Sequence, residues 1–166
     1  DIPYEIGPLY ENNDLIKYGR GGCGPKNRYL AKKLTNLGYK VKVCFTPYSW
    51  SNLKKLPEKL LHHPKARRIG NHVYLKVKIS SQWIKIDATW DRWLYPILPA
   101  NINWNGRSNQ TIATPIIREI CQDYPEPYMS NYLKNKKNPK ITKSDGDFSE
   151  KMNKWFNEIR RKNNSK

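Results

Sequence analysis

A β-hairpin predicted over residues 71–90 constrains the fold of this chain more than any other feature. Two runs of alternating apolar and polar residues, 71–79 and 82–90, flank the dipeptide Ser80-Ser81. A two-residue loop fixes the strand register, because each position then has one partner. In that register one face collects the apolar side chains that we expect to face the core: Val73, Leu75, Val77, Ile79, Ile84 and Ile86.

The same register brings a histidine and an aspartate together on the other face. His72 pairs with Thr89 and Tyr74 pairs with Asp87, so His72 and Asp87 become diagonal neighbours within roughly 8 Å. A carboxylate beside an imidazole fixes its tautomer and stabilises the imidazolium. A loop longer by one residue would send Asp87 to the core face instead.

A cysteine lies at the predicted start of a helix, in the sequence Gly21-Gly22-Cys23-Gly24-Pro25. Leucines at helical spacing follow, and Gly38 supplies a stop. Free N–H groups at a helix start stabilise a thiolate and can hold an oxyanion. We expect Gly22 and Gly24 to leave room for a substrate backbone. The alternative is that Cys23 is an inert, buried thiol.

These segments together resemble the transglutaminase-like superfamily, a branch of the papain-like cysteine enzymes. The resemblance rests on Gly22-Cys23-Gly24, on 37–41, on His72 opening a strand and on 82–89, with weaker support from 103–106 and a final helix. These additional segments are similar to those of uncharacterised prokaryotic members of the superfamily. The resemblance implies an α+β fold with an antiparallel sheet packed against the cysteine helix. It also implies that Cys23 is the nucleophile, His72 the base and Asp87 its orienting carboxylate.

The chemistry expected of such a chain is thiol-mediated acyl transfer without a cofactor. Hydrolysis of an amide or isopeptide bond in a peptide or protein is favoured over transamidation, because amine transfer needs a site that excludes water. The alternative is a non-catalytic basic module on the same fold that binds nucleic acid or another polyanion. The intact set of Cys23, His72 and Asp87 argues against that alternative.

Basic residues dominate the charge, with 31 Lys and Arg against 14 Asp and Glu and a formal net charge of +17. This balance indicates either a solvated basic surface or an anionic partner, such as an acidic protein substrate or nucleic acid. Without a nucleic-acid-binding motif, charge shows attraction but not specificity. No apolar run reaches the roughly 20 residues of a membrane span, so no membrane association is expected. The oligomeric state stays open.

Three cysteines, Cys23, Cys44 and Cys121, make an odd number. An odd number fits reduced thiols better than a disulfide framework, which predicts a cytoplasmic location. A leader removed ahead of Asp1 is compatible with the sequence. Cys44 with His62-His63 lacks the paired spacing of metal ligands, so no metal site is expected.

The length of 166 residues suits one domain. Around the motif region 20–90 we expect a short helix over 13–18, a strand over 39–46, a helix within 53–61, a mobile basic segment at 130–147 and an amphipathic helix over 148–162.

Four aromatic residues are candidates for the walls of a substrate site: Trp50, Tyr74, Trp83 and Trp90. Tyr74 and Trp83 share the His72 face in the predicted register. Ordinary packing is the alternative for all four.

Overall fold

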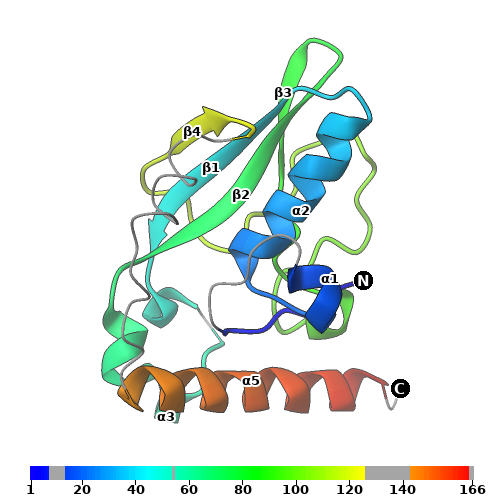
Figure 1. Ribbon diagram of the computed structural model, residues 1–166. Coiled ribbons are helices and arrows are strands. Elements are labelled where there is room, and N and C mark those ends of the chain that lie inside the picture. Colours follow the sequence, from blue (N-terminus) through cyan, green and yellow to red (C-terminus); the bar gives the residue numbers. More distant parts are fainter. Residues whose placement is uncertain (8–13, 54, 126–142, 165–166) are drawn as a thin grey trace.

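The computed structural model describes residues 1–7, 14–53, 55–125 and 143–164, and it shows a mixed α+β architecture (Figure 1). One antiparallel sheet has the strand order β3-β2-β1-β4. Its strands are β1 (Val41–Tyr48), β2 (Gly70–Ile79), β3 (Gln82–Ile86) and β4 (Ile120–Asp123). The α+β class is confirmed. The strand expected at 39–46 begins and ends two residues later, and β4 was not expected.

The hairpin of β2 and β3 has the predicted register. Ile79 pairs with Gln82 and Leu75 with Ile86, which confirms the two-residue loop. The strand expected over 82–90 is shorter, because β3 ends at Ile86, so the expected pairs of Tyr74 with Asp87 and of His72 with Thr89 do not form. Ser80 adopts a φ of 54°, as a tight hairpin turn requires. The expected core face is also confirmed, because its side chains form one hydrophobic cluster with those of β1; five of them are buried and Ile79 is partly buried.

Helix α2 (Cys23–Asn36) packs on that apolar face. Ala31 is fully buried against the strands, and Leu30 and Leu34 pack beside it. The helix ends where Gly38 takes a φ of +88°, the left-handed conformation that glycine adopts without strain. Burial of the apolar side of α2, formed by Leu30, Ala31 and Leu34, therefore fixes how the helix lies on β1 and β2.

A second hydrophobic cluster lies around the lower end of the sheet, where α5 (Lys143–Asn164) runs across the molecule (Figure 1). Phe148, Met152, Phe156 and Ile159 of α5 are buried at helical spacing. The predicted amphipathic helix is confirmed and is longer than 148–162. Because 143–147 are helical, the expected mobile segment was wrong there, and 130–142 lie outside the described residues.

Shorter elements complete this end of the molecule. Helix α1 (Asp14–Tyr18) matches the helix expected over 13–18. The helix expected within 53–61 is only one turn, α3 (Glu58–Leu61). Three 3₁₀ turns lie at Trp50–Asn52, Pro64–Arg67 and Arg92–Leu94. Every helix in the described part of the chain is too short or too polar to span a bilayer.

Cys44 and Cys121 form a disulfide, so the expectation of three reduced thiols was wrong. The two cysteines are direct partners in the pairing of β1 with β4, with their Cα atoms 4.1 Å apart. An odd count is also satisfied by one disulfide and one free thiol, which is Cys23. The argument from reduced thiols to a cytoplasmic location therefore fails, because disulfides persist mainly in oxidising compartments.

Candidate active site

Cys23 is the first residue of α2 and packs against both hydrophobic clusters. The chain before it is held by a short parallel bridge, in which Gly21 N–H donates to Pro3 O at 3.2 Å and Glu5 N–H donates to Gly21 O at 3.1 Å. Gly22 caps the helix in extended backbone and makes no side-chain cap. The helix start is therefore anchored by the N-terminal strand segment rather than by a capping side chain.

His72 and Asp87 are hydrogen-bonded, with 2.8 Å between Nε2 and Oδ2. This confirms that the two side chains meet on the face of the hairpin opposite the apolar cluster. This part of the face is shielded from solvent, since His72 is only 4% exposed and Asp87 only 5%. The rings of Tyr48 and Tyr74 lie against the imidazole, with centroids 6.3 and 6.2 Å away. Burial makes the His72–Asp87 interaction stronger than it would be at a surface.

Cys23 and His72 line the same pocket, and the electrostatic interaction between them shifts the pKa of each. Burial raises the pKa of Cys23, but the hydrogen bond and charge of His72 outweigh it and bring the pKa below its ordinary value. Burial likewise lowers the pKa of His72, yet hydrogen bonds to Asp87 and Cys23 raise it to about 10. These shifts favour a thiolate beside an imidazolium at neutral pH.

Asp87 is held in place from several directions. Its Oδ1 accepts from Thr89 N–H at 2.9 Å and its Oδ2 from Ala113 N–H at 2.8 Å. Burial raises the pKa of Asp87, but the hydrogen bond and charge of His72, together with hydrogen bonds from Thr89 and Ala113, lower it below the usual range. The carboxylate is therefore charged and fixed toward the imidazole.

Asn27 explains why the start of α2 reaches His72. Strand β3 ends at Ile86, so the ladder stops before Val73 and Ala88, which would be partners two steps further along the same register. The amide of Asn27 lies between them: Nδ2 donates to Val73 O at 2.8 Å, and Oδ1 accepts from Ala88 N–H at 3.0 Å. The backbone of Val73 also contributes to the lowered pKa of Cys23. Asn27 thus replaces one step of the β-ladder and brings α2 to the separated strand ends.

Sequence reasoning missed Asn27. The signal was present, because Asn27 lies four positions after Cys23 and therefore on the same side of the helix. An amide on the buried side of a helix needs partners, and separated strand ends offer both a donor and an acceptor.

A pocket opens beside the Cys23 sulfur. Its lining includes four aromatic residues, Tyr4, Tyr48, Trp50 and Trp90, together with residues 113–115. Trp50 and Trp90, both predicted as wall residues, line it. Trp90 Nε1 is buried and has no hydrogen-bond partner within the described part of the chain. The lining of the pocket is therefore largely aromatic.

The other predicted wall residues do not line this pocket. Tyr74 is buried with its hydroxyl donating to Glu119. Trp83 does share the His72 face, but it pairs with Lys78, about 20 Å from His72 at 3.3 Å per residue. The prediction for Trp83 was wrong because two residues on the same face of a sheet can lie far apart along the strand.

Gly22 and Gly24 also lie outside the pocket lining. A Cβ on Gly24 would come within 2.8 Å of the Arg28 guanidinium, and one on Gly22 would contact Glu5 O at 3.5 Å. Both glycines therefore face neighbouring protein atoms rather than the space expected for a substrate backbone.

The segment 110–121 crosses the sheet beside the site. Gln110 Oε1 accepts from Asp87 N–H at 2.7 Å, and Ile117 N–H donates to Thr46 Oγ1 at 3.2 Å. The disulfide at Cys121 fastens the end of this segment to β1. One covalently attached segment therefore supplies both support for Asp87 and a wall of the pocket.

A buried ion pair connects the site to α5. Asp91 is fully buried and accepts from Arg160 Nη2 and from Tyr4 N–H, at 2.7 and 2.8 Å. Lys26 donates to Thr89 O at 2.8 Å, and burial lowers its pKa to about 8 against the opposing influence of Asp91 and Asp87. Since Tyr4 lines the pocket, Arg160 helps to hold a pocket wall.

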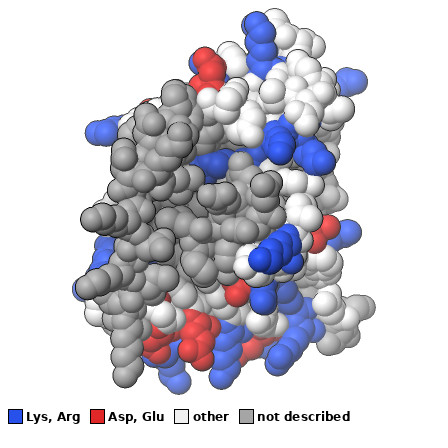
Figure 2. Space-filling view, viewed as in Figure 1, with Lys and Arg blue, Asp and Glu red and all other residues white. Residues whose placement is uncertain are grey.

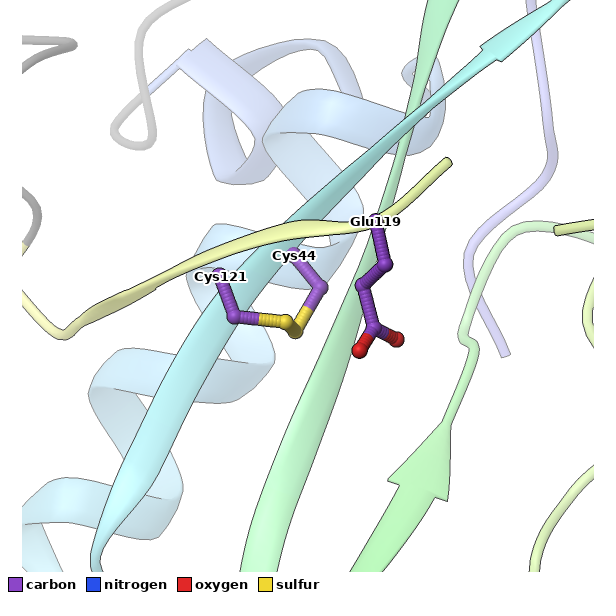
Figure 3. Close-up of side chains that lie close together, drawn as sticks. All are labelled: Cys44, Glu119 and Cys121. Carbon is purple, nitrogen blue, oxygen red and sulfur yellow. A yellow bond between two sulfur atoms is a disulfide. The ribbon is translucent and has the colours of Figure 1, made fainter. Parts of the chain in front are cut away.

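One group of three candidate metal ligands comes together among the described residues: Cys44, Cys121 and Glu119 (Figure 3). The two sulfur atoms are bonded to each other, so neither is a thiolate that could bind a metal. Glu119 instead interacts with Tyr74 and Lys76. With the disulfide formed, Cys44 and Cys121 are a structural cross-link, and the neighbouring Glu119 carboxylate already has its partners in Tyr74 and Lys76.

Comparisons of the chain with protein-family models, with curated proteins and with solved structures returned no match. The resemblance to the transglutaminase-like superfamily therefore stays a prediction from motif residues, and the functional argument rests on the site itself.

Proposed function

We propose that this chain is a cysteine-nucleophile acyl-transfer enzyme of the papain-like, transglutaminase-like type. The observation that carries the proposal is the buried His72–Asp87 hydrogen bond in an aromatic pocket that Cys23 also lines, together with the lowering of the Cys23 pKa by His72. A structural cysteine needs no lowered pKa, whereas a nucleophile does.

Each residue has a role that its contacts support. The Cys23 thiolate attacks the carbonyl carbon of an amide, and the negative charge moves to the carbonyl oxygen. The Cys23 N–H at the helix start can hold that oxygen. The His72 imidazolium then gives its proton to the leaving amine as the C–N bond breaks, while Asp87 keeps the ring oriented.

The resulting thioester is resolved by an acceptor. Water would give a proton to neutral His72 as its oxygen attacks the thioester, and collapse of the intermediate would release a carboxylic acid and restore the Cys23 thiolate beside the His72 imidazolium. An amine acceptor would release a new amide by the same route. We favour hydrolysis of an amide or isopeptide bond in a polypeptide, because the pocket lies beside surface loops and water needs no recognition site.

Intact-mass spectrometry with an activated ester, p-nitrophenyl acetate, tests the chemistry without knowledge of the natural substrate. The wild-type protein should gain one acetyl group on Cys23 and then lose it in water. Cys23→Ala should gain none at that position, and His72→Ala should acylate at least tenfold more slowly. Cys23 acylation at equal rates in the wild type and in His72→Ala would contradict the proposal, as would no acylation of Cys23.

A further inference from the structure

A second feature of the sheet is a cluster of lysines on the face that α2 leaves uncovered. The cross-strand partners Lys42, Lys76 and Lys85 form one row, and Lys78 with Trp83 forms the next. We call these five residues the lysine face. Basic side chains are spread widely over the view in Figure 2, so net charge alone locates no partner, but the register places these four lysines side by side.

Placing like charges opposite one another destabilises a sheet. Directly opposed side chains have Cβ atoms about 5 Å apart, and like-charged pairs are unfavourable on a scale of about 0.2–1 kcal/mol. Two such pairs occur here, Lys42 with Lys76 and Lys76 with Lys85. Lysines on edge strands prevent aggregation, but β1 and β2 are the central strands, so edge protection does not explain Lys42, Lys76 or Lys78.

Acidic residues neutralise only part of this charge. Glu119 pairs with Lys76, and the mostly exposed Asp123 lies 3.6 Å from Lys42. Within the described residues, no ion pair involves Lys78 or Lys85. Counting the described residues alone, four lysines against Glu119 and Asp123 leave the lysine face with a net positive charge that an anionic partner can neutralise.

Trp83 adds an aromatic surface to this charge. Trp83 is 38% exposed, and Lys42 Nζ lies 5.3 Å from the centroid of its ring. An exposed aromatic ring among ammonium groups suits single-stranded nucleic acid, whose bases stack on aromatic rings while its phosphates bind cations. An acidic polypeptide would use the lysines and leave Trp83 without a role.

We propose that the lysine face binds single-stranded nucleic acid, with phosphates on Lys76, Lys78 and Lys85 and a base stacked on Trp83. The surface is separate from the Cys23 pocket, because Tyr74 and Glu119 lie between His72 and the lysine rows. Binding should therefore be independent of the proposed acyl chemistry, and Cys23→Ala should bind like the wild type.

Fluorescence anisotropy with a labelled 20-nucleotide oligo(dT) across a salt series tests this surface. Lys78→Gln with Lys85→Gln removes two charges from the face, and Lys32→Gln with Lys33→Gln removes two from α2, so each double variant has a formal charge of +17 − 2 = +15. The face variant should lower the slope of log affinity against log salt by about 1.4, at about 0.7 for each phosphate contact. The α2 variant should keep the wild-type slope.

Trp83→Ala should weaken binding about tenfold at fixed salt and leave the slope unchanged, since base stacking contributes about 1–3 kcal/mol. Lysine acetylation of the wild-type protein gives a second readout that needs no variant to fold. Bound oligo(dT) should protect Lys78 and Lys85 and leave Lys32 and Lys33 reactive.

Three results would overturn the proposal. Equal losses in the two double variants would show attraction by net charge alone. Poly-glutamate that binds as tightly as oligo(dT), with no effect of Trp83→Ala, would make the partner an acidic polypeptide. No binding of oligo(dT) at low salt, or uniform acetylation of all four lysines, would make the lysine face an ordinary solvated surface.

Discussion

Tyr74 lies parallel to the imidazole of His72, with 6.2 Å between ring centroids and 11° between planes. The tyrosine is fully buried and is the cross-strand partner of Cys44, which carries the disulfide. Cys44, Tyr74 and His72 therefore form a continuous packed group on one side of the sheet. The disulfide fastens the segment that covers this group, so the covalent link and the reactive site belong to the same part of the fold.

Selective alkylation tests the activation of Cys23. The lowered pKa of the thiol predicts that iodoacetamide at pH 7 modifies Cys23 of the unreduced protein while Cys44 and Cys121 stay unmodified. His72→Ala should slow the reaction at least tenfold, because the hydrogen bond and charge that lower the pKa of Cys23 are lost. Peptide mapping by mass spectrometry measures each site, and an unchanged rate in His72→Ala would refute thiol activation.

Stability against pH should reveal the imidazolium. Because the pKa of His72 is raised from 6.5 to about 10, its stabilising contribution is fully present below pH 6.5 and is lost as pH rises toward 10. The pKa of Cys23 is lowered, so its contribution grows with pH below its unfolded value of 9.0 and offsets that loss. The wild-type stability should therefore change little between pH 6.5 and 9.

Removing the thiol should expose the contribution of His72. In Cys23→Ala, Asp87 still raises the pKa of His72 but the contribution of Cys23 is lost, so the free energy of unfolding should fall with rising pH above pH 6.5, relative to the wild type, over a narrower range than a pKa of about 10 would give. Urea denaturation at pH 6 and pH 8 measures this difference. Parallel pH profiles for the two proteins would mean that the thiol and imidazole do not exchange a proton in the folded state.

Asn27→Ala should destabilise the protein strongly. The substitution leaves Val73 O and Ala88 N–H buried without the amide that joins them, at about 1–3 kcal/mol for each group. We expect the free energy of unfolding to fall by about 3 kcal/mol in urea. Asn36→Ala, at the exposed end of the same helix, is the matched control and should change it by less than about 0.5 kcal/mol. Equal effects of both substitutions would contradict the bridging role of Asn27.

Loss of the disulfide should also destabilise the fold. Cys44 and Cys121 are separated by 77 positions, and closing a loop of that size stabilises a protein by about 4 kcal/mol in the chain-entropy account. The double variant Cys44→Ala, Cys121→Ala should lose about this amount in urea denaturation. Adding a reductant should destabilise the wild type but not the double variant. A wild type insensitive to reductant would show that the bond does not form in solution.

The amino-acid sequence by itself determined the parts of the site that depend on local patterns. The alternation along 71–79 and 82–90, with the two-residue loop, was enough to place His72 beside Asp87. The helix start at Cys23 and the amphipathic face of α5 also follow from local rules of spacing and turn chemistry. These patterns suffice because each one is satisfied by hydrogen bonds and packing between residues close in the chain.

Tertiary structure decided what lies over and around those residues. The pairing of β4 with β1 forms the disulfide, and the burial of His72 depends on side chains from several segments. The stretch 88–119 has no apolar periodicity from which to predict that it supports Asp87. Asn27 and Arg160 find their partners 61 and 69 positions away. Contacts at such separations form only when the chain has packed, since the free energy that selects them comes from burial and hydrogen bonding in the assembled core.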